Sequence, residues 1–154
     1  MTGRAAPFPV PDVLAYLAGT WRVERTVRDL STGAEGRFTG TVRFTPDGGG
    51  RLRQHESGTF VWQGTPRPAE RTLDFEPGVE QGTALVRFTD GRPFHDLDLR
   101  SGRHTADHPC AQDLYKGEFE VQDEGHWHMR WRVRGPAKDL VLTTDCTRDN
   151  TQSS

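Results

Sequence analysis

Five side chains that can move a proton or bind a metal ion lie close together in the stretch RHTADHPCAQDLYKGEF, residues 103–119. They are His104, His108, Cys110, Asp113 and Tyr115. A histidine oriented by a carboxylate and placed near a phenol is a usual arrangement for general acid–base catalysis. The same residue types also suit a polar turn between two strands, in which they have no chemical role. The faces that these residues occupy in the fold decide between the two interpretations.

The composition indicates one sheet-rich domain. The chain has 154 residues, of which only 32% are hydrophobic, and its mean hydropathy is −0.76. It nevertheless contains four Trp, eight Phe and two Tyr, which supply large apolar rings for a core. This length is typical of a single domain. The net charge of −2 gives no bulk electrostatic reason to expect nucleic acid or an anionic membrane as a partner.

The hydrophobic pattern predicts one short helix followed by a long series of strands. Asp12 is suited to cap a helix over residues 12–18, and Gly19 is suited to end it. After the helix, apolar residues alternate with polar ones, as they do in half-buried strands. We count about ten such segments, at a spacing of roughly 8–14 residues. The turn PDGGG at residues 46–50 is a strong hairpin signal.

These elements predict an all-β protein, an antiparallel up-and-down barrel of about ten strands. Each connection is short enough for a hairpin, and closing the sheet removes the exposed edges that a long meander would have. We expect an N-terminal segment and lid helix at residues 1–18, which closes one end of the barrel. The barrel domain then covers residues 19–148, and residues 149–154 form a flexible tail.

The stretch LAGTWRVER at residues 17–25 resembles the Gly-x-Trp signature on the first strand of the calycin superfamily, which includes lipocalins, fatty-acid-binding proteins and nitrobindin-like barrels. The resemblance implies a calycin-like barrel in which a basic residue of the last strand packs over the tryptophan. Arg148, in TTDCTR, stands at the position of this basic residue. A cation–π contact between Arg148 and Trp21 would close the base of the barrel. The chain also resembles an uncharacterised bacterial family through the patterns HPC..D.Y.G and W.V.GP.KD, and this family brings no assigned reaction.

Alternation along the predicted strands places several ionisable side chains inside the barrel. Burying such groups costs free energy unless they pair or bind a ligand, and about ten strands leave room for one. We therefore predict a small-molecule cavity lined by aromatic rings and a few polar groups. The candidate catalytic residues are His108, Asp113, Tyr115 and Glu56. The candidate substrate-binding residues are Arg25, Arg71, His95, Trp62, Cys110 and Gln54.

Each of these residues also has a structural interpretation. Asp113 suits the cap of the turn before its strand, and Cys110 suits an inert buried thiol. Arg25 and Glu56 suit an interior ion pair with no chemical role. Tyr115 suits packing with one buried hydrogen bond.

Three functions fit the predicted cavity. The first is a cofactor-free acid–base enzyme that acts on a mostly apolar metabolite by cyclisation, isomerisation, dehydration or hydrolysis. In it, His108 or His95 serves as the base, Asp113 orients it, and Tyr115 or Arg25 stabilises negative charge. The second is a non-catalytic carrier of a fatty acid-like or aromatic ligand, whose carboxylate Arg25 and Arg71 hold. The third, implied by the resemblance to nitrobindin-like barrels, is haem binding by one histidine. A monomer and a homodimer are both compatible with the sequence.

The segment HWHMRWRVRGP at residues 126–136 raises the question of a metal site. His126 and His128 share one face of the predicted strand, which could bind zinc or copper. The apolar face consists of Trp127, Met129, Trp131 and Val133. Both histidines therefore face outward in a solvated basic surface with Arg130, Arg132 and Arg134, and we predict no metal site. In the following turn, GPAKD, we expect Lys138 to pair with Asp139.

Localisation is predicted from two absences. No apolar run approaches the length of a membrane span, and the first residues lack the continuous apolar core of a signal peptide. We therefore expect a cytoplasmic protein. Cys110 and Cys146 should then be reduced thiols, because the cytosol disfavours structural disulfides.

Overall fold

The computed structural model describes residues 6–110 and 113–149, which form one short helix and ten strands. The helix, α1 (Val13–Leu17), is capped by Asp12, whose side chain accepts a hydrogen bond from the amide of Ala15. The strands are β1 (Gly19–Asp29), β2 (Glu35–Pro46), β3 (Leu52–Trp62), β4 (Thr65–Pro77), β5 (Ala84–Phe88), β6 (Pro93–Leu97), β7 (Arg103–Cys110), β8 (Asp113–Asp123), β9 (His126–Gly135) and β10 (Lys138–Arg148).

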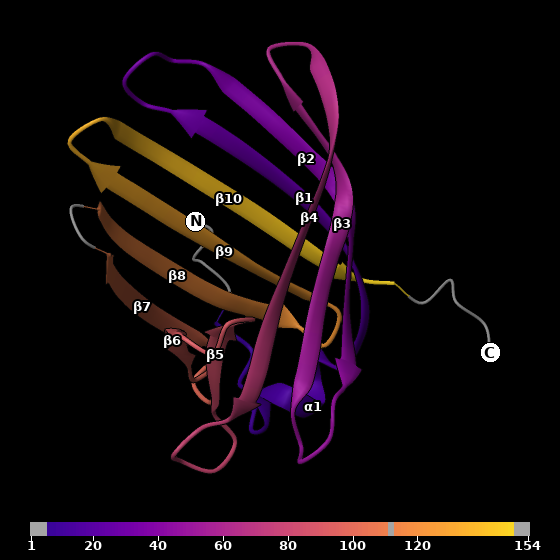
Figure 1. Ribbon diagram of the computed structural model, residues 1–154. Coiled ribbons are helices and arrows are strands. Elements are labelled where there is room, and N and C mark those ends of the chain that lie inside the picture. The colour runs from indigo at the N-terminus through magenta and orange to yellow at the C-terminus, as the bar shows by residue number, and fades with distance from the viewer. Residues whose placement is uncertain (1–5, 111–112, 150–154) are drawn as a thin grey trace.

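The ten strands belong to one antiparallel sheet with up-and-down topology. Their order is β6-β5-β4-β3-β2-β1-β10-β9-β8-β7, so the pairing of β1 with β10 joins the two halves of the chain. Figure 1 shows the sheet curling into a barrel with α1 at one end. The predicted antiparallel barrel of about ten strands with a short N-terminal helix is confirmed. Among the described residues, no helix combines the length and the apolar character needed to cross a membrane.

Side chains close the barrel between β6 and β7. These strands are the two edges of the described sheet, and they lie beside each other. His104 on β7 donates from Nε2 to the backbone carbonyl of Asp96 on β6, at 2.9 Å. Behind this hydrogen bond, the rings of Phe94 and His108 pack together with centroids 5.2 Å apart. The barrel is therefore nearly closed, and we call the junction of β6 with β7 the seam.

Arg148 lies over Trp21 at the base of the barrel, as the sequence predicts. Its Cζ is 4.2 Å from the centroid of the indole ring, and the two residues are direct partners on β10 and β1. The guanidinium also donates to the backbone carbonyls of Tyr16, at 2.7 Å, and Ala18, at 3.4 Å. Trp21 is fully buried and donates from Nε1 to the carbonyl of Leu17 at 2.9 Å. These contacts join the first strand, the last strand and α1.

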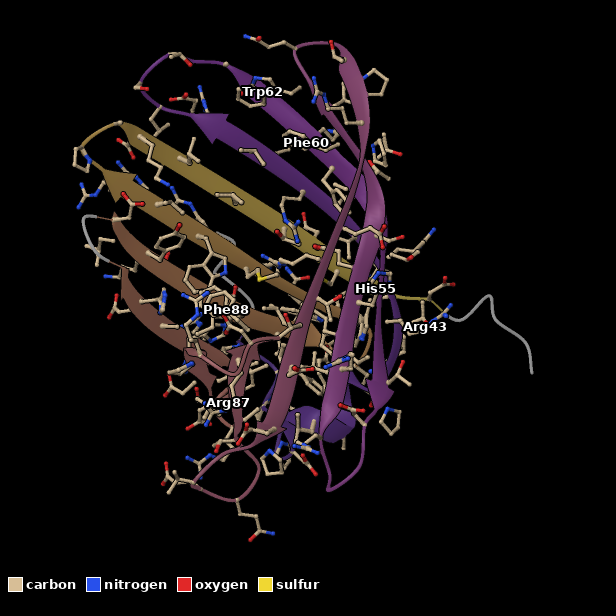
Figure 2. The ribbon with its side chains drawn as sticks, in the orientation of Figure 1. Arg43, His55, Phe60, Trp62, Arg87 and Phe88 are labelled. Carbon is tan, nitrogen blue, oxygen red and sulfur yellow. The ribbon has the colours of Figure 1, made fainter. Side chains whose placement is uncertain are left out.

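The apolar core is densest at the α1 end of the barrel, where Val13 and Leu17 are fully buried. The wall is shorter on one side, because β5 and β6 have five residues each whereas β3 and β4 have 11 and 13. β4 pairs with β5 only over Leu73–Pro77, so the first half of β4 extends beyond that wall (Figure 1). Phe60 and Trp62, which lie far from α1 in Figure 2, are only partly buried. The barrel is thus well packed at the α1 end and less so at the other.

Candidate ligand pocket

A pocket of about 250 Å³ lies inside the barrel, formed by β1, β2, β3, β4 and β10. Its walls are mostly apolar, and three charged side chains meet at one place in it. The lining residues are Arg25, Val27, Phe38, Glu56, Phe60, Ala69, Glu70, Arg71 and Leu142. Glu70 also pairs with His55 at 2.8 Å. The pocket therefore brings together three of the predicted site residues: Arg25, Glu56 and Arg71.

Glu56 is buried between two arginines. Its Oε2 accepts a hydrogen bond from an Nη of Arg25 at 2.7 Å, and its Oε1 lies 3.9 Å from an Nη of Arg71. The side chain of Glu56 is only 5% exposed and that of Arg25 only 13%. A buried carboxylate is tolerated when cations compensate its charge. With two guanidiniums for one carboxylate, the group has a net charge of about +1.

Arg25 is held by two short side-chain hydrogen bonds, whereas Arg71 makes a single long ion-pair contact. Arg25 donates from Nε to the hydroxyl of Thr144 at 2.8 Å, and its Cζ lies 5.2 Å from the ring centroid of Phe38. The side chain of Arg71 is 47% exposed, and its one ion pair among the described residues is the long contact with Glu56. Desolvation lowers the pKa of Arg71, but an arginine titrates so high that this guanidinium stays charged at neutral pH. Arg71 is therefore the more accessible of the two cations and the better placed to bind a ligand.

The ring of Phe38 lies over a pair of glycines. Gly40 on β2 and Gly58 on β3 are direct partners. A Cβ at Gly40 would come within 2.9 Å of the Phe38 ring, and a Cβ at Gly58 within 2.8 Å. At Gly40 it would also meet the carbonyl oxygen of Ser57 at 2.2 Å. Because Gly40 and Gly58 have no side chains, the Phe38 ring has room to lie over them and to form a wall of the pocket.

A second group of predicted site residues lies near the seam. His108 on β7 and Tyr115 on β8 are direct partners whose ring centroids are 5.8 Å apart. Phe94 stacks on Phe88 with centroids 4.7 Å apart and on Trp131 with centroids 5.3 Å apart. We call these five residues the seam cluster; Phe88 is labelled in Figure 2. None of them lines the pocket around Glu56.

His95 packs against the seam cluster. Its ring centroid lies 5.3 Å from that of Trp131 and 5.4 Å from that of Phe119. Its Nδ1 donates to the backbone carbonyl of Asp96 at 2.6 Å. Burial lowers the pKa of His95 to about 4, so the ring is neutral at neutral pH. With the proton on Nδ1, the Nε2 atom keeps a lone pair that can accept a hydrogen bond.

Asp113 is held by an ion pair with Lys138, whose Nζ lies 3.0 Å from its carboxylate. The prediction that Lys138 pairs with Asp139 is therefore wrong. Asp139 instead accepts two hydrogen bonds from Arg132, at 2.7 and 3.0 Å. Lys138 and Asp139 are adjacent residues of β10, and side chains of adjacent residues in a strand point to opposite faces of the sheet.

The other three predicted residues lie apart. Trp62 stacks on Phe60 with ring centroids 6.0 Å apart, next to the pocket wall. Gln54 is 5% exposed, and its Oε1 has no hydrogen-bond partner among the described residues. The side chain of Cys110 lies outside the part of the chain that the structure describes.

The sequence-based prediction does not include Thr144, Phe38 or Leu142, all of which help to form the site. Each has the inward-facing parity of its strand, so the periodicity places them in the interior. Parity does not distinguish a pocket wall from an ordinary core position. The register of β1 with its two neighbouring strands is needed to identify these residues as part of the site, because it makes Arg25 the direct partner of both Thr144 and Phe38.

His126 and His128 do not form a metal site with other side chains in the described structure. His126 pairs with Asp123, with Nδ1 and Oδ1 2.9 Å apart, and His128 lies 3.3 Å from the carboxylate of Glu120. No group of three His, Cys, Asp or Glu side chains in residues 6–110 and 113–149 is placed to hold a metal ion. The outward direction predicted for these histidines agrees with the burial of Trp127 and Met129 beside them.

Several solved structures are similar to this fold. The S-type phycobiliprotein lyase CPES from Guillardia theta is similar over 94% of this chain and 95% of its own, with a TM-score of 0.69 and 9% identity. A protein of unknown function from the DUF3598 family of Nostoc punctiforme PCC 73102 is similar over 97% of this chain, with a TM-score of 0.55 and 14% identity. This chain spans 54% of the length of that second protein. At such identities, the similarity shows the fold alone.

A family model matches residues 17–148, which include all the strands from β1 to β10. Its description is "Family of unknown function (DUF6314)". Among curated proteins, no sequence matches the chain.

Proposed function

For this chain, which belongs to the DUF6314 family of unknown function, we propose that the barrel binds a small amphipathic molecule with an acidic group. One observation carries the proposal: the buried Glu56 carboxylate lies between Arg25 and Arg71 inside a mostly apolar pocket. Glu56 holds Arg25, and the remaining positive charge belongs to Arg71. An acidic group of a ligand would neutralise that charge.

The pocket walls indicate the rest of the ligand. Val27, Phe38, Phe60, Ala69 and Leu142 offer only apolar contacts. The volume of about 250 Å³ lies just below the roughly 300–1,000 Å³ usual for small-molecule sites. The molecule is therefore compact, with an apolar or aromatic body. This corresponds to the carrier function predicted from the sequence, with Arg71 as the main anion-binding residue.

An acid–base enzyme is the second candidate, and the pairing of His108 with Tyr115 favours it. The neutral ring of His95 nearby supplies a lone pair that could accept a proton. The ion pairs of Glu56 with Arg25 and of Asp113 with Lys138 argue against the four predicted catalytic residues acting as one unit. Cyclase or isomerase chemistry without a cofactor thus stays a prediction, as does the haem alternative.

Titration with the anionic aromatic dye 1-anilinonaphthalene-8-sulfonate tests the proposed binding function. We expect dye fluorescence to rise on binding, and octanoate but not octylamine to displace the dye. Arg71→Gln should weaken dye binding at least about tenfold, because one charge-assisted contact contributes about 1.5–3 kcal/mol and about 1.4 kcal/mol corresponds to a factor of ten. Circular dichroism should show an unchanged fold.

Arg67→Gln is the matched control, since Arg67 lies on the same strand with the same parity but does not line the pocket. It should bind the dye as the unmodified protein does. Equal losses in both variants, or displacement by octylamine as effective as by octanoate, would show that Arg71 does not recognise an anion.

A further inference from the structure

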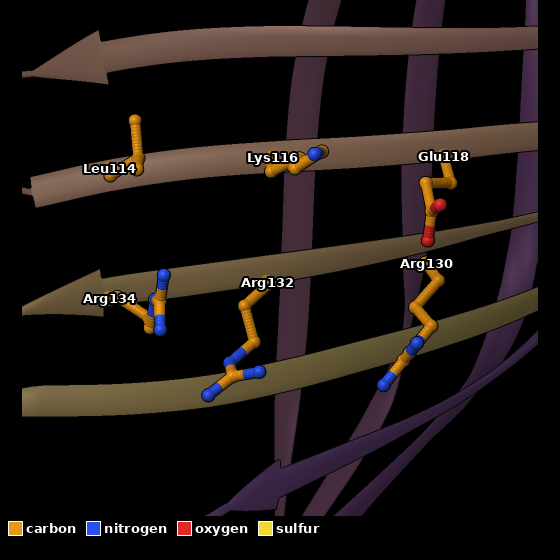
Figure 3. Close-up of a pocket in the computed structure, with 6 residues that line it drawn as sticks. All are labelled: Leu114, Lys116, Glu118, Arg130, Arg132 and Arg134. Atoms are coloured by element: carbon orange, nitrogen blue, oxygen red, sulfur yellow. The ribbon is translucent and has the colours of Figure 1, made fainter.

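The outer face of β8 and β9 carries a surface that the pocket does not use. Its cations are Lys116, Arg130, Arg132 and Arg134, which we call the basic row. They border a hollow of about 260 Å³ on the protein surface, together with Leu114 and Glu118. Figure 3 shows the three arginines following one another along one strand, with Leu114, Lys116 and Glu118 along the next.

The basic row sets like charges opposite each other. Lys116 and Arg132 are direct partners across β8 and β9. Like charges in this position destabilise a sheet, although Lys116 also has an acidic neighbour, because Asp107 on β7 is its direct partner on the other side. Arg132 has a carboxylate partner in Asp139, but no ion pair involves Lys116, Arg130 or Arg134 among the described residues. Asp107, Glu118 and Asp139 lie directly opposite Lys116, Arg130 and Arg134, so the cations of the row exceed the facing carboxylates by one.

From this arrangement we propose that the basic row docks an extended acidic segment of a partner protein. Arg130, Arg132 and Arg134 are spaced two residues apart on one strand, which sets their Cα atoms about 6.6–6.8 Å apart. Alternate side chains of an extended peptide have the same repeat, so successive Glu or Asp side chains can meet successive arginines. Leu114, which is 46% exposed, adds an apolar contact at one end of the row.

Nucleic acid fits this surface less well. Single strands bind to surfaces that combine cations with aromatic rings on which bases stack. The aromatic residues of β8 and β9 have the opposite parity and pack in the interior, as Phe119 and Trp127 do. Glu118 is the direct partner of Arg130 and disfavours phosphates and carboxylates alike at that end of the row.

Fluorescence anisotropy of a labelled peptide tests the proposal. The probe is a peptide of about ten residues with alternating Glu and Thr, in the extended repeat of a strand. At about 0.15 M salt it should bind the full chain, and Lys116→Glu should weaken binding at least about tenfold. The same variant should unfold at a temperature close to that of the unmodified protein, because a carboxylate at position 116 gains attraction to Arg132 and loses attraction to Asp107. Circular dichroism should show an unchanged fold, so that a loss of binding cannot come from misfolding.

Arg43→Glu is the matched control. Arg43 is an exposed arginine on the outer face of β2, away from β8 and β9 (Figure 2). This variant should bind the peptide as the unmodified protein does. The proposal is overturned if both variants lose affinity equally, if the peptide does not bind at this salt concentration, or if a single-stranded oligonucleotide of the same charge binds more tightly and is displaced by the peptide.

Discussion

At the level of single residues, a gain in folding stability does not explain why Arg25, Glu56 and Arg71 are grouped inside the barrel. A buried ion pair is often no more stable than well-packed apolar residues of similar size, although removing one partner is strongly destabilising. Glu56 holds Arg25 in place, and Thr144 fixes the other side of that guanidinium. Arg71 is the more accessible cation in the same pocket. A binding site accounts for this arrangement better than core packing does.

His95 gives the stability of the protein a pH dependence. Its pKa is about 4 in the folded chain, against an ordinary value of 6.5, mainly because burial disfavours the charged ring. Below pH 6.5 the unfolded chain therefore takes up a proton that the folded chain does not, so stability falls as the pH falls. The loss should be roughly 3 kcal/mol in total and should be complete near pH 4. Urea denaturation at pH 7, 5.5 and 4 measures it.

His95→Phe should remove that part of the pH dependence, because a phenyl ring suits the aromatic surroundings and does not titrate. His55→Gln serves as the control, since His55 lies on the outer surface paired with Glu70. It should leave the acid-induced loss between pH 6.5 and 4 in place. If His95→Phe loses as much stability on acidification as the unmodified chain, His95 is not the group responsible.

At the level of elements, the close pairing of β2 with β3 shapes the pocket. Gly40 and Gly58 face each other there, and the ring of Phe38 occupies the space above them. Gly40→Ala should destabilise the protein by about 1–3 kcal/mol, because its Cβ meets a backbone carbonyl and the Phe38 ring. The displaced ring should also reduce binding of the anionic dye. Urea denaturation and dye titration measure the two effects.

Gly125→Ala is the control for this substitution. A Cβ at Gly125 meets its nearest neighbour at 3.6 Å, an ordinary contact, and the residue lies in the turn between β8 and β9. Stability and dye binding should both stay close to those of the unmodified chain. If Gly40→Ala were equally harmless, Phe38 would not depend on the glycine pair for its position.

The sequence predicts most of the helix and strands because their signals are local. These signals are the alternation of apolar and polar residues, the turn residues between strands, and Asp12 as the helix cap. It also predicts the contact of Arg148 with Trp21 from the pattern at the two ends of the chain. Parity alone places Arg25, Glu56 and Tyr115 on inner faces without saying which of them meet. That depends on the stagger between strands, which brings Arg25 to Glu56 two strands away. The tilt of a barrel is a property of the whole sheet, so no local pattern reveals it.

At the level of the whole molecule, the barrel has two regions of unequal stability. β1, β2, β9 and β10 pair on both sides, and α1 and the Arg148 contacts tie the base of the barrel together. β6 and β7 are sheet edges held to each other by the hydrogen bond from His104 to Asp96 and by the seam cluster. Edges with few backbone hydrogen bonds open locally at a lower free-energy cost than central strands. The seam is therefore the part of the wall that we expect to open first.

Hydrogen exchange measured by mass spectrometry tests this difference. Amides of β6 and of the outer edge of β7 should exchange at least about tenfold faster than those of β1 and β10, since opening free energies range from near zero at edges to the global value in central strands. His104→Ala should speed exchange further in β6 and β7 and leave β1 unchanged, because it removes the hydrogen bond to Asp96. Thr105→Ala, on the exposed face of the same strand, should have no such effect. Equal protection of all these strands would mean that the seam is as stable as the rest of the barrel.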